Sequence, residues 1–141
     1  GLVGNSDIII AAKGTKFGLP EVDRGALGAA THLARLVPPL KMRAMLLTCE
    51  NATAEELHNW GSVYAVVDDK DALSAKAREV AETFKKKNPY VVRTAKECLN
   101  NIDPVDVNRS YRFEQGFTFQ LNLAGVADEE RDAFVSDKSK K

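Results

Sequence analysis

The segment that most constrains the fold lies near the start of the chain, where residues 7–12 read DIIIAA. Alternating apolar and polar residues would indicate a strand with one solvated face. This β-branched run has no alternation, which indicates a strand buried on both faces. A strand of that kind needs other strands beside it, and the rest of the chain offers few. We therefore expect this chain to be a fragment or cleavage product that pairs with an upstream polypeptide.

Turn and capping residues divide the rest of the chain into short segments. Apolar residues at helical spacing predict a helix over residues 26–36, which the proline pair Pro38-Pro39 would end. Thr53 and Glu56 form a capping-box pattern, in which each side chain bonds the other residue's backbone N–H at a helix start. The further predicted elements are a helix over residues 39–47, a strand over residues 62–67, a helix with an apolar stripe from Leu73 to Phe84, and three helices that begin at Asn88-Pro89, at Asp103-Pro104 (ending at Leu123) and at Asp128 (ending at Phe134).

Charge and cysteine content exclude several classes of protein. The 20 basic and 20 acidic side chains leave no net charge, so no overall field favours nucleic acid. Cys49 and Cys98 lie far apart and no histidine pair is near either, so neither a disulfide framework nor a metal site is indicated. No apolar run is long enough to cross a bilayer. We expect a cytoplasmic α/β protein with neither a nucleic-acid nor a membrane partner.

Several segments, in order along the chain, resemble those of a known family. The sequence SDIIIAA at residues 6–12, FGLPEV at residues 17–22 and the following Gly25 are similar to the signature of the crotonase, or enoyl-CoA hydratase/isomerase, superfamily. Further similar landmarks are RLV at 35–37, residues 42–48, AEE at 54–56, WGSV at 60–63, AKE at 95–97 and AFV at 133–135. The resemblance therefore covers nearly the whole chain.

This resemblance implies a fold, a substrate class and an assembly. Residues 1–67 would be the end of the ββα core of the crotonase-like (ClpP/crotonase) spiral fold, with few strands. Residues 68–141 would be a helical region that forms a homotrimer or a dimer of trimers. The substrate would be an acyl-CoA, with coenzyme A as part of the substrate and no separate cofactor. Two backbone N–H groups would stabilise the thioester enolate, and both donors would lie upstream of Gly1.

Glu21 is the candidate catalytic residue. It follows a proline in a glycine-rich segment, where a carboxylate can enter a cleft, or can remain on the surface and bond backbone N–H groups. The resemblance implies the first, with Glu21 as a general acid/base. A second family glutamate falls at Gly1, which cannot move a proton. The loss of that group disfavours simple hydration and suits reactions that need one carboxylate.

The resemblance also implies residues that bind the acyl-CoA. We expect Gly1, Leu19, Leu27, His32 and Phe117 to line the acyl pocket. His32 could be a second proton carrier or a packed helix residue, and Phe117 could equally be a core or trimer contact. The CoA adenine would pack on Phe134, and its phosphates would meet Lys138, which could instead be an ordinary solvated lysine.

Three segments narrow the expected reaction. Residues 25–32, GALGAATH, form a shorter loop than is usual in the family. Together with GLVGNS at residues 1–6 and YRFEQGF at residues 111–117, this loop is similar to an actinobacterial subgroup of steroid C/D-ring breakdown. The implied reaction is hydrolytic ring opening of a bicyclic β-diketone CoA ester, a retro-Claisen cleavage of a carbon–carbon bond. The alternatives are an enoyl-CoA hydratase or isomerase of fatty-acid β-oxidation that uses Glu21 alone, and an inactive fragment that acts as an oligomerisation module.

Overall fold

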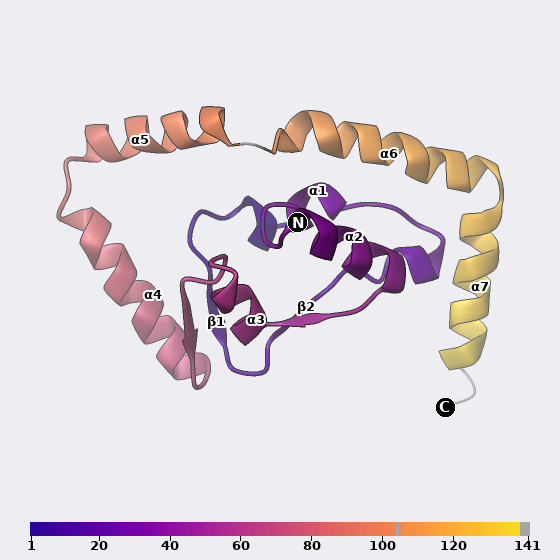
Figure 1. The fold of residues 1–141 in the computed structure, drawn as a ribbon, viewed down its shortest axis with the longest axis horizontal. Coiled ribbons are helices and arrows are strands. Elements are labelled where there is room, and N and C mark those ends of the chain that lie inside the picture. The colour runs from indigo at the N-terminus through magenta and orange to yellow at the C-terminus, as the bar shows by residue number, and fades with distance from the viewer. Residues whose placement is uncertain (104, 139–141) are drawn as a thin grey trace.

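A computed structural model describes residues 1–103 and 105–138 of the chain. The first half holds every strand of the described residues, and four longer helices follow it (Figure 1). The elements are η1 (Val3–Asn5), β1 (Ile10–Ala12), β2 (Lys16–Phe17), η2 (Val22–Arg24), α1 (Ala30–Leu33), α2 (Pro39–Thr48), β3 (Ala52–Thr53), α3 (Ala54–Asn59), β4 (Ala65–Val67), α4 (Lys70–Lys85), α5 (Pro89–Ile102), α6 (Val107–Leu123) and α7 (Val126–Lys138).

The strand expected near the start of the chain forms in its last three residues. β1 pairs in parallel with β4, and Ala11 lies opposite Val66. Because parallel strands need a crossover connection, the intervening chain passes through α1, α2 and α3 before β4 returns. Ala11 is buried, but Ile8 is 40% exposed, so the strand is not covered on both faces along its whole length. A second, antiparallel pair joins β2 to β3, a two-residue strand that the sequence did not predict.

The hydrophobic core lies between β1 and the helices of the first half. Met45 of α2, Leu57 of α3 and Val63 before β4 are fully buried. Leu33 and Leu36 join them from the segment around α1. The capping box predicted for α3 is confirmed, since the Thr53 and Glu56 side chains each bond the other's backbone N–H. This cap fixes the direction in which α3 enters the core.

The helix predicted over residues 26–36 is mostly wrong. Ala29 has a positive φ of 63°, which an α-helix cannot contain, so α1 starts only at Ala30 and spans four residues. The apolar positions are still used, because Leu33, Leu36 and Val37 are buried in the core. The periodicity therefore identified the buried face correctly but not the backbone conformation.

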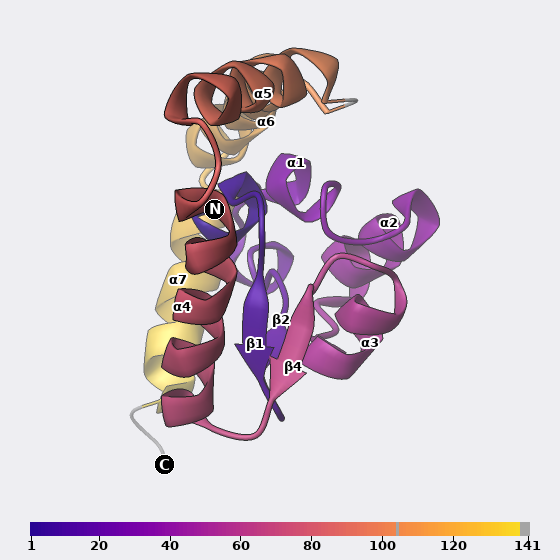
Figure 2. The same cartoon turned by 90° about the vertical axis from the view of Figure 1, so that its left-hand side faces the viewer.

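The four later helices run around the outside of the first half, with α5 and α6 nearly end to end (Figure 1). Figure 2 shows α4 beside β1 and α3 beside β4. The stripe predicted for α4 is core only in part: Val80 is buried, whereas Phe84 is 41% exposed. α4 packs mainly on the small β1–β4 sheet, which is too short to cover the whole helix.

Two of the predicted helix starts are wrong by a few residues. α6 is capped by Asp106, whose side chain accepts a hydrogen bond from the Arg109 N–H, and so it starts after the predicted Asp103. α7 begins at Val126, so Asp128 lies inside its first turn. The start at Asn88-Pro89 is confirmed, with the Asn88 side chain capping α5. An aspartate can cap a helix or a turn, and only the tertiary contacts decide between them.

Candidate functional site

Glu21 lies at the turn between β2 and η2. Its backbone carbonyl accepts hydrogen bonds from the N–H groups of Arg24 and Ala26, and Gly25 ends η2 with a φ of 61°. That left-handed conformation favours glycine, so the family-like glycine has a local structural role. The Glu21 Oε2 atom is buried and has no hydrogen-bond partner among the described residues. Such an atom costs stability, which is expected of a functional group rather than of a structural one.

A pocket of about 210 Å³ opens between η1, β2 and α1. It brings together three of the residues expected to bind substrate: Gly1, Leu19 and His32. Leu27 and Phe117 lie outside its lining, and Phe117 is 43% exposed on α6. The Glu21 carboxylate is not part of the lining either, although Leu19, two residues earlier, is. The roles of these residues therefore stay predictions, and the structure adds where each one lies.

His32 lies at one wall of this pocket. Gly4 approaches it so closely that a Cβ added to Gly4 would lie 2.6 Å from the His32 Cβ and 2.7 Å from the His32 carbonyl oxygen. The Tyr111 ring makes a T-shaped contact with the imidazole, with centroids 5.2 Å apart. Burial lowers the pKa of His32 below its ordinary value, although the Glu114 carboxylate opposes this effect. His32 is therefore neutral near pH 7 and able to accept a proton.

One face of α6 binds the segment that forms the pocket wall. The Glu114 Oε1 atom accepts a hydrogen bond of 2.8 Å from the Thr31 N–H, and the Thr118 hydroxyl donates to the Leu27 carbonyl. Figure 1 shows α6 passing over α1. Glu114 did not emerge from the sequence as a site residue, because it lies 83 residues from Thr31. In the sequence, Glu114 stood out only as part of the YRFEQGF segment at residues 111–117.

The two residues expected to bind CoA lie on α7. The backbone of Phe134 and Lys138 is helical, but their side chains lie outside the described part of the structure. Their contacts with adenine and phosphate stay predictions.

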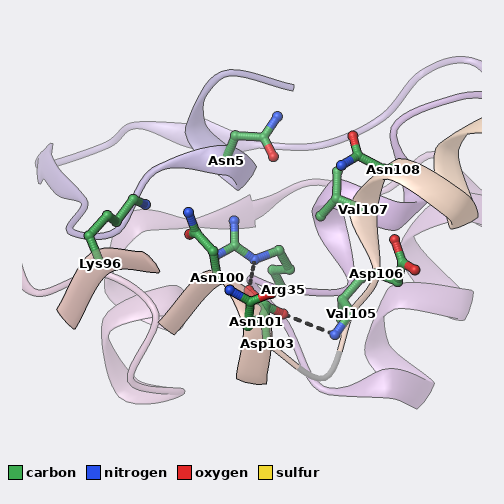
Figure 3. A pocket seen from close by; sticks show the side chains of 10 residues that line it. All are labelled: Asn5, Arg35, Lys96, Asn100, Asn101, Asp103, Val105, Asp106, Val107 and Asn108. Atoms are coloured by element: carbon green, nitrogen blue, oxygen red, sulfur yellow. Dashed lines mark hydrogen bonds and ion pairs between the residues drawn. The ribbon is translucent and has the colours of Figure 1, made fainter. Parts of the chain in front are cut away.

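A second pocket of about 570 Å³ lies between η1, the end of α5 and the start of α6 (Figure 3). It is lined mainly by asparagines and charged groups and contains none of the expected site residues. Both of its basic side chains already have partners: Arg35 Nε lies 2.8 Å from Asp103 Oδ2, and Lys96 pairs with Asp7. An apolar acyl group has little to bind here, so we place the candidate site at the smaller pocket.

No helix within residues 1–103 and 105–138 is long and apolar enough to cross a membrane. The same residues contain no group of three or more His, Cys, Asp or Glu side chains placed to hold a metal ion.

Comparison with known proteins identifies the family. The model of the enoyl-CoA hydratase/isomerase family matches residues 1–127. This chain belongs to that family, the crotonase superfamily. Two curated relatives, from Rhodococcus jostii and Mycobacterium tuberculosis, are 59% and 58% identical over 135 residues, or 96% of this chain. Both are named (7aS)-7a-methyl-1,5-dioxo-2,3,5,6,7,7a-hexahydro-1H-indene-carboxyl-CoA hydrolase.

Solved structures of crotonase-family proteins confirm the fold. A carnitinyl-CoA hydratase from Mycobacterium avium superposes with a TM-score of 0.85 at 27% identity, over 96% of this chain and 54% of that one. The expected crotonase-like α/β architecture is therefore correct. The chain spans about half the length of the curated relatives, 52% and 54%.

Proposed function

We propose that the protein containing this chain hydrolyses a carbon–carbon bond in the CoA ester of a bicyclic β-diketone, as a step of steroid breakdown. The observation that carries this proposal is the identity of 58–59% with two CoA hydrolases named for a dioxo-hexahydroindene substrate, across 96% of the chain. The alternatives, an enoyl-CoA hydratase or isomerase and an inactive oligomerisation module, have no relative of comparable identity among those described above.

The number of carboxylates expected at the site agrees with a hydrolase. In a two-carboxylate hydratase, one group handles the water and the other handles the substrate. Gly1 occupies the position where the family resemblance implies the second glutamate, and Glu21 is the carboxylate that remains. Hydrolytic ring opening needs one carboxylate that takes a proton from water and later returns it to carbon.

In the proposed reaction, Glu21 removes a proton from water as the water oxygen bonds to the ring ketone carbon. The resulting alkoxide reforms a C=O bond, and the bond between that carbon and the α-carbon of the thioester breaks. The released electron pair enters the thioester as an enolate, which backbone N–H groups from outside this chain would stabilise. Glu21 then gives its proton to the α-carbon. The product is a ring-opened acid that still carries CoA.

We also propose a cytoplasmic homotrimer or dimer of trimers, in which the later helices make the subunit contacts. Large apolar side chains are exposed on α5 and α6, including Tyr90 at 72% and Phe113 at 71%. Exposed apolar surface of this extent is typical of protein interfaces. The adenine of CoA would bind at Phe134 and its phosphates at Lys138.

Turnover of two CoA esters would test the proposed activity. We expect kcat/KM of the complete protein to be roughly 10²-fold or more higher for a bicyclic β-diketone CoA ester than for a straight-chain enoyl-CoA. The reason is that binding energy specific to the bicyclic group would stabilise the transition state. Mass spectrometry of the acyl-CoA products would follow both reactions. A preference for the enoyl-CoA would instead support the hydratase alternative.

A further inference from the structure

Two buried polar atoms, one on α1 and one on α6, lack partners in the described part of the chain. His32 is only 8% exposed, and its Nδ1 atom has no hydrogen-bond partner among the described residues. The same is true of Glu114 Oε2. Either atom left unpaired costs about 1–3 kcal/mol, so two of them where α6 packs on α1 call for an explanation.

The surrounding contacts hold these two groups next to each other. Thr31, the neighbour of His32 in the chain, donates its N–H to the other oxygen of the same Glu114 carboxylate at 2.8 Å. Tyr111, which lies three residues before Glu114 on the same face of α6, makes a T-shaped contact with the His32 ring. Two anchors from one helix face therefore fix both the carboxylate and the imidazole.

The two atoms are also chemically complementary. A carboxylate oxygen only accepts hydrogen bonds, whereas Nδ1 of a neutral imidazole can carry the proton and donate it. We propose that Glu114 Oε2 accepts a hydrogen bond from His32 Nδ1–H, directly or through one water, so that His32 Nε2 is left as a proton acceptor at the pocket. His32 and Glu114 then form a dyad, with Glu114 as the positioning residue.

This dyad supplies a step that the ring-opening reaction needs, and its catalytic role rests on the proposed function. The attacking water carries two protons. Glu21 takes the first and returns it to the α-carbon, and the second remains on the new carboxylic acid. His32 Nε2 accepts this second proton as the acid ionises to a carboxylate, and then releases it to solvent. Hydration of an enoyl-CoA has no such second proton to remove.

The charges around His32 suit this role. Burial lowers the pKa of His32, the Glu114 carboxylate of α6 raises it, and the Arg35 guanidinium after α1 lowers it. The Tyr111 hydroxyphenyl ring packs against the imidazole from α6 as well. Because the lowering effects dominate, the resting imidazole is neutral and ready to accept a proton at pH 7.

NMR of the imidazole nitrogens tests the dyad in the unsubstituted protein. We expect neutral His32 in the Nδ1–H tautomer, whereas an Nε2–H tautomer would overturn the proposal. His58 serves as the internal reference, because its Nδ1 atom lies 2.7 Å from the Val63 carbonyl, away from the pocket. This measurement requires no variant to fold and does not depend on turnover. Absence of ring opening would refute the proposed function alone.

The variant Glu114→Gln gives the second test. Its amide oxygen can still accept the Thr31 N–H, but its NH₂ group now faces Nδ1. We expect His32 to change to the Nε2–H tautomer, and its pKa to fall because the Glu114 charge is lost. We also expect kcat for ring opening to fall roughly 10²-fold, which is the lower end of the usual contribution of a positioned proton carrier. The acidic limb of the pH–rate profile should move to lower pH. Glu97→Gln, an exposed change on α5, should alter none of these properties. An unchanged His32 tautomer and pKa in folded Glu114→Gln would overturn the dyad, even if activity fell.

Discussion

The variant Glu21→Gln is expected to turn over the β-diketone CoA ester roughly 10²–10⁴-fold more slowly than the unsubstituted protein, the usual contribution of a positioned proton carrier. Glutamine keeps the shape of the side chain but cannot exchange a proton. The binding of the CoA ester should barely change, because the proposed enolate donors and the adenine contact lie elsewhere. Stability should also hold or rise, because the variant no longer buries an unpartnered carboxylate oxygen. Steady-state kinetics and urea unfolding would measure these effects.

Asp23→Asn is the matched control for this substitution. Asp23 is an exposed carboxylate in η2, two residues after Glu21. Removing the Asp23 charge should leave turnover within about twofold of that of the unsubstituted protein, as is usual for a surface change away from the site. Near-normal turnover in a folded Glu21→Gln variant would remove Glu21 from the mechanism. A loss of about 1 kcal/mol in stability with intact turnover would instead indicate a loop carboxylate that bonds backbone N–H groups.

Leu57→Ala is expected to destabilise the protein by about 2–5 kcal/mol, since a buried leucine that is shortened loses its transfer free energy and leaves a cavity. Leu57 has no exposed surface, and its carbonyl accepts the N–H groups of both Ser62 and Val63 at the turn that leads to β4. The cavity would thus lie where α3 meets the β1–β4 sheet. The midpoint of urea unfolding would measure the loss.

Asn59→Ala, an exposed change on the same helix, is the control for Leu57→Ala. It should change the free energy of unfolding by no more than about 0.5 kcal/mol. If the two variants unfolded at the same urea concentration, α3 would not pack against the core as described.

Local signals predicted much of the fold. The prolines at the starts of α2 and α5 and the capping box of α3 act within one helical turn, so the sequence alone reveals them. The resemblance of FGLPEV and its neighbours likewise indicated the crotonase-like architecture, which the superposition with a solved family structure confirms. Local chemistry therefore located most helices and the family without any tertiary information.

The features that sequence missed depend on distant contacts. Residue 29 adopts a left-handed conformation although it is an alanine and not a glycine, so nothing in the sequence indicated it. This conformation shortens α1 to a single turn. Glu114 binds the Thr31 N–H across 83 positions, and no periodicity connects two such residues. The pocket likewise joins Gly1, Leu19 and His32 from separate segments. These contacts follow from the packing of α6 against α1, which only the three-dimensional structure specifies.

Product analysis in ¹⁸O-labelled water tests the central claim most directly. The complete protein would be incubated with a bicyclic β-diketone CoA ester, and the product would be fragmented in a mass spectrometer. Ring opening through attack of water on the ketone predicts one ¹⁸O atom in a new carboxylate, with the CoA thioester intact. Release of free CoA, or ¹⁸O found only as a hydroxyl on the acyl chain of an enoyl-CoA substrate, would contradict the proposed carbon–carbon hydrolysis.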